Sequence, residues 1–184
     1  MYWCKSKPFI TVALIGCITI GGIGCKPDAA DKNASLTYFD IKGYFIADTI
    51  RLKKLDKPVT KTVTHNGVTE TKKVKVDNWG QELDMFMGAD INRPAWKNSY
   101  TILNGDNIIL YKAKDEDLKV REITIKKENG KVKWILIFTR TQNILYKTTE
   151  KLTYYPDSLY LIEKDQHVKL MGNNHYRIQG VLNR

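Results

Sequence analysis

The chain has 184 residues, 42% of them hydrophobic and 10% aromatic, and this composition excludes an intrinsically disordered protein. Its 30 basic and 20 acidic residues give a net charge of +10, carried mostly by lysine. Lysine makes a diffuse, hydrated positive surface, so we expect a solvated basic domain whose polyanionic contacts would be lipid headgroups or acidic glycans.

Residues 1–25 have the pattern of a secretory signal peptide. Lys5 and Lys7 precede an uncharged apolar run, Pro8 to Gly24, and Cys25 follows that run directly. The run is shorter than the roughly 20 apolar residues that span a bilayer comfortably, which disfavours a retained signal-anchor. All three cysteines lie within these residues, so no disulfide can form in the rest of the chain.

The placement of the cysteines resembles that in bacterial lipoprotein precursors. In that family the cysteine thiol is acylated and the chain is cut just before it, at a motif similar to Leu-x-Gly-Cys. The segment LIGC, ending at Cys17, matches this motif closely, whereas GIGC, ending at Cys25, has glycine in place of leucine. Cys25 is followed by a polar segment, so we predict lipidation at Cys25, with Cys17 or an unmodified leader as the alternatives.

This resemblance implies a cell-envelope protein, anchored in a membrane by its lipid and facing the periplasm or the cell surface. The expected partners are therefore the membrane and an envelope protein or lipid, and not nucleic acid. Residues 26–35 are predicted to be a flexible tether and residues 36–184 a single domain, which resembles small envelope lipoproteins.

Two helices are predicted in the N-terminal half of the domain. The first spans residues 36–54, with Ser35 or Thr37 as its N-cap, and the second spans residues 77–91, with Asn78 as its N-cap. Each has an apolar stripe at helical spacing, and we expect the second stripe to fill the concave face of a sheet. The stripes consist of Phe39, Ile41, Phe45, Ala47, Ile50 and Leu52, and of Trp79, Leu83, Phe86, Met87 and Ile91.

The remaining segments predict strands. Residues 59–76 predict a hairpin, because Asn66-Gly67 separates two arms rich in threonine and valine, and the polarity of both arms places it at a sheet edge. From residue 100 onward the pattern alternates with a period of two, with turn signals such as Gly-Asn-Asn at 172–174. Strands are predicted at 100–103, 108–113, 118–127, 132–140, 144–154, 158–169 and 176–182.

The short connections between these strands imply an antiparallel sheet. Val132 to Phe138 is apolar at both alternating sets of positions, so we expect this strand to be central and covered on both faces. The predicted fold class is α+β: a curved antiparallel β-meander of about six to eight strands, packed on one or two helices from the N-terminal half.

Aromatic residues are concentrated in the predicted strands. One interpretation is a curved sheet that lines a cleft for an apolar or sugar ligand, and the alternative is ordinary core packing across strands. The candidate cleft residues are Trp96, Tyr100, Tyr111, Tyr146, Tyr154 and Tyr160.

The sequence contains no local motif for catalysis or metal binding. His65, His167 and His175 lack the spacing of a helical zinc site and have no cysteine available to join them, so we predict surface or turn histidines. The G-x-S-x-G, P-loop and G-x-G-x-x-G motifs are absent. We therefore predict no metal, no cofactor and no catalytic residue.

The leading functional hypothesis is a lipid-anchored envelope protein with a non-enzymatic binding domain for a lipid or another apolar ligand. Such a domain would be similar in outline to periplasmic lipoprotein carriers, which hold acyl chains in an incomplete barrel; this is an analogy of fold alone. Two alternatives stay open: a protein–protein interaction or assembly module, and a hydrolase that acts on envelope polymers.

Overall fold

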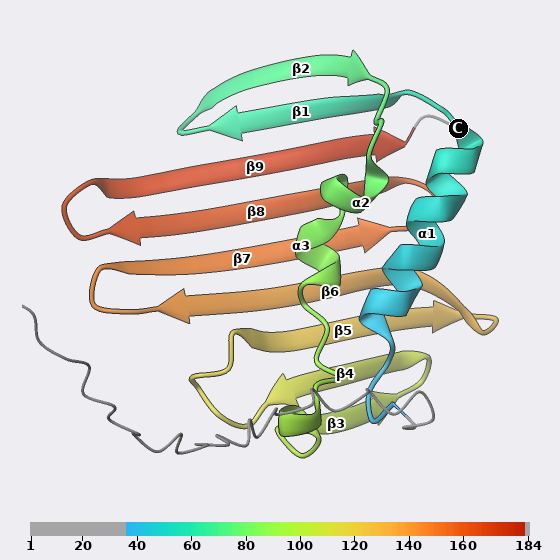
Figure 1. The fold of residues 1–184 in the computed structure, drawn as a ribbon, viewed down its shortest axis with the longest axis vertical. Coiled ribbons are helices and arrows are strands. Elements are labelled where there is room, and N and C mark those ends of the chain that lie inside the picture. The colour runs from blue at the N-terminus through green and yellow to red at the C-terminus, as the bar shows by residue number, and fades with distance from the viewer. Residues whose placement is uncertain (1–35, 183–184) are drawn as a thin grey trace, which may run out of the picture. The chain divides into compact units, whose positions relative to one another are not determined.

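The computed structural model describes residues 36–182, and the predicted leader, the tether, Cys17 and Cys25 lie outside these residues. The described chain forms one nine-stranded sheet in the order β2-β1-β9-β8-β7-β6-β5-β4-β3 (Figure 1). Every neighbouring pair is antiparallel, which confirms the predicted α+β meander with one strand more than expected. The strands are β1 (Val59–His65), β2 (Val68–Val74), β3 (Tyr100–Gly105), β4 (Ile108–Ala113), β5 (Val120–Glu128), β6 (Lys131–Gln142), β7 (Tyr146–Tyr155), β8 (Leu159–Val168) and β9 (Gly172–Leu182).

The β1–β2 hairpin lies at one edge of the sheet, as its polar arms predict. Asn66 and Gly67 have φ angles of 48° and 87°, which are the positive values that a type I′ turn requires. The hairpin does not pair with the strand that follows it in the chain. Instead β1 pairs along its whole length with β9, from Val59 opposite Leu182 to His65 opposite Tyr176.

The last strand begins earlier than the sequence predicts. Gly172, Asn173 and Asn174 belong to β9 and not to a turn, and they extend its ladder with β8. Two side-chain contacts explain this difference: Asn173 Oδ1 lies 2.6 Å from His167 Nδ1, and Asn66 donates to the Asn174 side chain at 3.3 Å. These pairings stabilise an extended backbone in residue types that ordinarily favour turns.

Helix α1 (Ile41–Leu55) begins later than predicted, and its N-cap is neither Ser35 nor Thr37. The side chain of Asp40 caps it, accepting a hydrogen bond from Gly43 N at 2.7 Å. The buried positions are Ile41, Phe45, Asp48 and Leu52. The predicted stripe was therefore wrong at two positions: Ala47 and Ile50 are exposed, and a carboxylate takes the buried position between them.

The predicted second helix is broken into two single turns, α2 (Trp79–Glu82) and α3 (Asp84–Met87). The break is at Leu83, whose φ of −104° and ψ of 14° leave the helical region. The Asn78 side chain caps α2 as predicted, accepting from Gln81 N at 3.0 Å. Most of the apolar stripe is still buried, because it also packs without a continuous helix: Trp79, Leu83, Phe86 and Ile91 are buried, and Met87 is half-buried.

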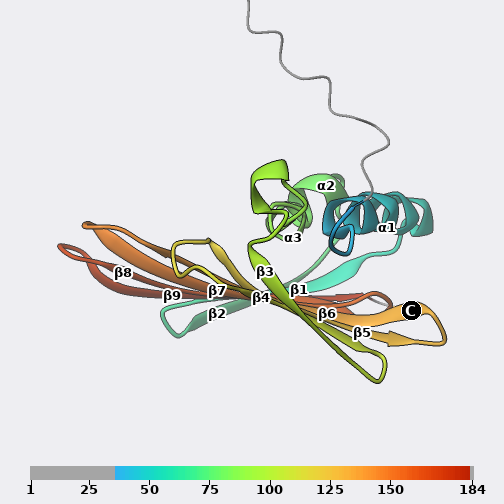
Figure 2. The same ribbon diagram turned by 90° about the horizontal axis from the view of Figure 1, so that it is seen from below.

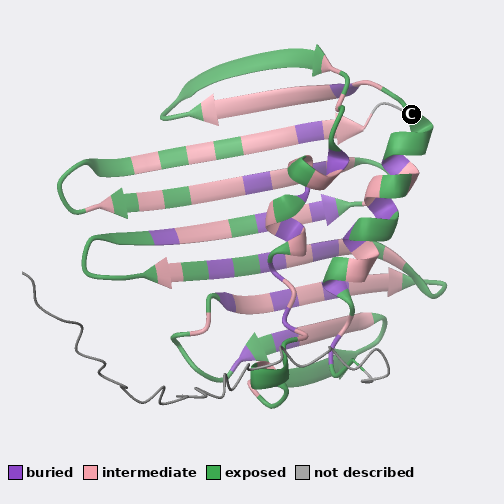
Figure 3. Cartoon of the chain, viewed as in Figure 1, coloured by how far each residue is buried: buried purple, intermediate pink, exposed green. Residues whose placement is uncertain are grey.

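The helices lie on one face of the sheet only, and Figure 2 shows this arrangement from the side. The strands alternate accordingly: Ile135 and Ile137 of β6 are 0% exposed, whereas Phe138 is 41% exposed. The prediction that this strand is covered on both faces was therefore wrong. Its second apolar face is part of the open side of the sheet, and buried positions gather where the helices cross the strands (Figure 3).

Candidate functional site

The structure does not bring the six predicted cleft residues together. Tyr146 is exposed at the start of β7, and Trp96 is half-buried in the 3-10 turn η1 (Pro94–Trp96). The four others are buried in the core on the helix-covered face: Tyr100, Tyr111, Tyr154 and Tyr160. These four positions therefore match the alternative interpretation of core packing, and they form two separate groups.

The first group surrounds Tyr38, just before α1. Its ring centroid lies 5.5 Å from those of Tyr100 and Tyr111, in edge-to-face geometry. The Tyr100 hydroxyl donates to Val120 O at 3.0 Å, and the Phe39 N–H donates to the Tyr111 hydroxyl at 3.1 Å. Burial raises the pKa of Tyr100 to about 12, so it stays a neutral donor. This group connects the segment before α1 to β3 and β4.

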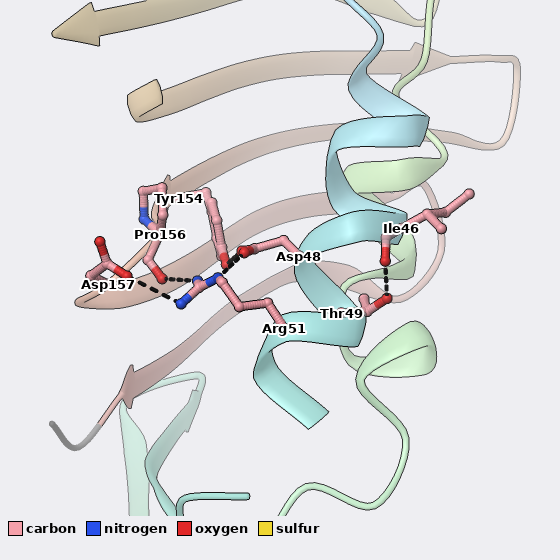
Figure 4. Close-up of polar contacts among 7 residues, drawn as sticks. All are labelled: Ile46, Asp48, Thr49, Arg51, Tyr154, Pro156 and Asp157. Carbon is pink, nitrogen blue, oxygen red and sulfur yellow. Dashed lines mark hydrogen bonds and ion pairs between the residues drawn. The ribbon is translucent and has the colours of Figure 1, made fainter. Parts of the chain in front are cut away.

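The second group contains Tyr154 of β7, which contacts Asp48 and Arg51 of α1. We call these three residues the Tyr154 cluster. The Tyr154 hydroxyl donates to Asp48, and Arg51 Nε donates to the same carboxylate (Figure 4). Burial, followed by the charge of Asp48, raises the pKa of Tyr154. Phe45 and Phe86 pack on its ring, with centroids at 4.9 and 5.7 Å. The cluster therefore fixes α1 to β7 by a buried charged contact inside an aromatic group.

Tyr160 belongs to the second group as well, because it lies opposite Tyr154 on the neighbouring strand β8. It forms a similar cluster with Glu82 and Lys61, and we call these three residues the Tyr160 cluster. Its hydroxyl donates to Glu82 of α2, and Lys61 Nζ of β1 lies 2.7 Å from that carboxylate. Burial, followed by the hydrogen bond to Glu82, raises the pKa of Tyr160. The Tyr160 ring also lies directly over Gly180, where an added Cβ would be 2.1 Å from the ring.

A surface pocket of about 410 Å³ lies beside the Tyr154 cluster, at the C-terminal end of α1. We call it the α1 pocket. Its deepest side chains are apolar and buried: Leu52 is 4% exposed, Val59 1% and Trp79 5%. Leu55, at 49% exposure, borders it on the solvent side. The complete lining is Arg51, Leu52, Leu55, Lys57, Pro58, Val59, Trp79, Pro156, Asp157 and Leu182.

Cations outnumber acids at the rim of the α1 pocket. Arg51 reaches from α1 to the β7–β8 connection, where it donates to Pro156 O at 2.6 Å and to Asp157 at 3.1 Å (Figure 4). Its hydrogen bond to Asp48 raises the pKa of Arg51, so the guanidinium stays charged. Lys57 is exposed and has no ion pair with any residue that the structure describes. The pocket thus combines an apolar floor with two positive groups.

Two further pockets differ from the α1 pocket in their chemistry. A more open groove of about 560 Å³ lies beside α2, and its rim includes the acids Asp77 and Glu82 as well as Lys61 and Lys75. Another, of about 390 Å³, lies at the far end of β7–β9 and is lined by polar residues. These are Asn66, Lys147, Thr149, Asp165, Gln166, His167, Asn173, Asn174 and His175.

All three histidines are exposed, as predicted, but each lies in a strand and not in a turn. His65 stacks on Tyr176 with centroids 4.3 Å apart, and His175 Nδ1 lies 2.6 Å from Asp165. Within residues 36–182, no group of three or more His, Cys, Asp and Glu side chains is arranged to bind a metal ion. The same part of the chain contains no helix long and apolar enough to cross a membrane.

Sequence reasoning missed the α1 pocket because its lining comes from four separate segments, residues 51–59, 79, 156–157 and 182. Trp79 and Leu52 were identified, but only as members of the apolar helix stripes. The one local signal was Asp56-Lys57-Pro58, a helix stop that leaves Lys57 beside apolar side chains. A comparison with known protein families, with curated proteins and with solved structures finds no match to this chain.

Proposed function

We propose that this protein is a lipid-anchored protein of the cell envelope whose domain binds a lipid or another apolar ligand without catalysis. The leader residues support the anchor, with Cys25 as the acylated residue and Cys17 as the alternative. The observation that carries the binding function is the α1 pocket, whose volume of about 410 Å³ falls within the usual range for small-molecule sites.

The α1 pocket brings apolar side chains close to the surface, and no other described residue fills the space above them. Trp79 and Val59 belong to the hydrophobic core, and the pocket reaches them from the surface. An apolar ligand that fills this space would remove the remaining exposed apolar surface from water. Each square ångström of apolar surface so removed stabilises the complex by roughly 25 cal/mol. Leu55, half-exposed at the rim, would be covered by the same ligand.

Binding and anchoring are tested separately on the full-length chain. For anchoring, cells are labelled with a palmitate analogue; Cys25→Ser should remove label and membrane retention, and Cys17→Ser tests the alternative. Unchanged labelling in the double variant would contradict the anchor.

For binding, the purified protein is titrated with Nile red, a neutral apolar dye. Leu55→Asp should weaken binding, because it places a charge at the rim.

The matched control is Ile50→Asp, on the same helix and 65% exposed, but outside the pocket lining. This variant should bind Nile red as the unmodified chain does. Absence of dye binding, together with no co-purifying small molecule in native mass spectra, would contradict the proposed binding function.

A second candidate, a protein interaction module, is favoured by a difference between the two sheet edges. Edge strand β2 carries Glu70, Lys72 and Lys73, which discourage pairing with another chain, whereas β3 carries no charged residue. In β3, Ile102 is 42% and Leu103 52% exposed. A partner strand could extend the sheet there.

The register identifies which backbone groups a partner would pair with. Lys114 N donates to Ser99 O at 2.9 Å, and bonded pairs alternate along an antiparallel ladder, so Ile102 and Asn104 direct their backbone groups away from β4. Crosslinking in intact envelopes should give one dominant partner, and Leu103→Lys should abolish it while Val68→Lys, on β2, should not. Only diffuse, salt-sensitive products would contradict this candidate.

A further inference from the structure

We infer that the ligand of the α1 pocket is an anionic amphiphile with a single acyl chain, whose headgroup lies between Arg51 and Lys57; this rests on the proposed binding function. The inference comes from the way in which apolar and charged side chains are divided around the pocket. The buried side chains Leu52, Val59 and Trp79 form the floor, and both lining cations lie toward solvent.

The volume favours one chain over two. At about 410 Å³, the pocket lies near the lower limit of small-molecule sites, which span roughly 300–1,000 Å³. Its floor of Leu, Val and Trp side chains offers one hydrogen-bond donor, the Trp79 indole N–H, to the several polar groups of a sugar ring. An alkyl chain needs none, so the apolar half of the ligand is an unbranched hydrocarbon.

The charge of the rim selects the headgroup. Arg51 is already positioned, because its contacts to Asp48 and to Pro156 O hold the guanidinium beside the pocket. A positioned guanidinium binds a carboxylate or a phosphate by two parallel hydrogen bonds. Lys57 adds a flexible ammonium group that no described acid neutralises. A cationic headgroup would instead meet two like charges.

Asp157 is the one acid in the lining, and an anionic ligand can displace it from Arg51. Its side chain is 75% exposed, and its ion pair with Arg51 spans 3.1 Å at the surface. Such exposed pairs contribute at most about 1 kcal/mol, so an incoming anion can replace Asp157 on Arg51 at small cost. The buried contact of Arg51 with Asp48 stays intact during this exchange.

The two further pockets described above do not fit this ligand. The groove beside α2 has the acids Asp77 and Glu82 as well as Lys61 and Lys75 in its lining, so its charges balance and do not favour an anionic headgroup. The pocket at the far end of β7–β9 is lined by polar side chains and offers no floor for a hydrocarbon. The combination of apolar floor and net positive rim is therefore specific to the α1 pocket among the three.

The test is displacement of Nile red from the full-length protein by three probes of equal chain length: palmitate, hexadecanol and hexadecyltrimethylammonium. Palmitate should displace the dye at the lowest concentration. Lys57→Gln should weaken the affinity for palmitate by about two- to fivefold, which is the effect of losing one exposed ion pair. It should leave the affinity for hexadecanol unchanged. Lys54→Gln, a lysine of α1 outside the lining, is the matched control and should change neither. Hexadecyl phosphate in place of palmitate distinguishes a phosphate from a carboxylate headgroup.

The outcomes separate this inference from the proposed function. If hexadecanol equals palmitate and Lys57→Gln changes neither, while Leu55→Asp still weakens dye binding, the binding domain stands and the anionic headgroup is wrong. If no probe displaces the dye and Leu55→Asp has no effect, both are wrong. An equal loss of palmitate affinity in Lys54→Gln and Lys57→Gln would show diffuse surface attraction, which also overturns the inference.

Discussion

Tyr154 and Tyr160 face each other across the β7–β8 ladder, and each donates its hydroxyl to a carboxylate that a cation also binds. The Tyr154 cluster and the Tyr160 cluster thus repeat one chemical arrangement, but they secure different helices. Asp48 belongs to α1, a helix of 15 residues, whereas Glu82 belongs to the single turn α2. A short helix has little stability of its own, so α2 depends more on its contact with the sheet.

The two clusters also differ in what surrounds the ring. Tyr154 is packed edge-on by Phe45 and Phe86, so its position follows from aromatic packing on the helix side. Tyr160 lies flat against the sheet because β9 has no side chain at Gly180. One helix contact thus depends on filled volume, and the other depends on an absent side chain. Substitutions separate these two requirements.

The largest effect is expected at Gly180. Gly180→Ala places a Cβ 2.1 Å from the Tyr160 ring, which Glu82 holds in place, so we expect a loss of about 3 kcal/mol in unfolding free energy. Urea denaturation measures it. In a Tyr160→Ala background the added cost of Gly180→Ala should disappear. Gly105→Ala is the control, because no atom lies within 4 Å of its added Cβ.

The next largest loss of stability is expected from removal of the carboxylates of Asp48 and Glu82. Asp48→Ala leaves the buried hydroxyl of Tyr154 without its acceptor and should cost about 2–4 kcal/mol. Glu82→Ala should cost less, about 1–2 kcal/mol, because Glu82 is 16% exposed and water can reach its partners. Chemical denaturation of both variants tests the order. Equal losses would show that burial does not distinguish the two clusters.

A smaller effect is expected on the pH dependence of stability, from the phenol groups of Tyr154 and Tyr160. The raised pKa values of Tyr154 and Tyr160 keep both protonated in the folded state, whereas the unfolded chain releases these protons above about pH 10. Their contribution is therefore complete below pH 10 and is lost as the pH rises toward the folded pKa values. Each should steepen the fall by up to about 1.4 kcal/mol per pH unit.

Tyr154→Phe and Tyr160→Phe should each flatten this alkaline fall, and the double variant should flatten it most. Denaturation midpoints between about pH 9 and 11 provide the measurement. At neutral pH each substitution should cost about 1.5 kcal/mol, the lower end of the range for a hydrogen bond to a charged group. A double variant with an unchanged alkaline slope would exclude these tyrosines as its source.

The smallest effect is expected at the surface end of the Tyr154 cluster. Asp157→Asn removes the exposed partner of Arg51 and should change stability by less than about 0.5 kcal/mol. It should at the same time strengthen palmitate binding in the dye assay, because the guanidinium no longer has a competing anion. A stability loss as large as that of Asp48→Ala would mean that Arg51 is fixed mainly by Asp157.

Local signals predicted most of the strands but not how the clusters form. The Asn66-Gly67 turn and the alternation from Tyr100 onward depend on neighbours in the chain, and both were predicted correctly. The burial of Asp48 could not be predicted, because a carboxylate is stable there only beside Tyr154, which follows it by 106 residues. The break at Leu83 and the α1 pocket likewise depend on packing between distant segments.

The pairing of β1 with β9 has a consequence for the order of folding. Asn66 and Asn174 are in contact although they lie 108 positions apart in the sequence, so the β1–β2 hairpin has no neighbouring strand until β9 has left the ribosome. Such long-range closure is slow. The β1–β2 hairpin therefore joins the sheet only once the whole domain has been synthesised, whereas β3 to β8 can pair in the order in which they are made.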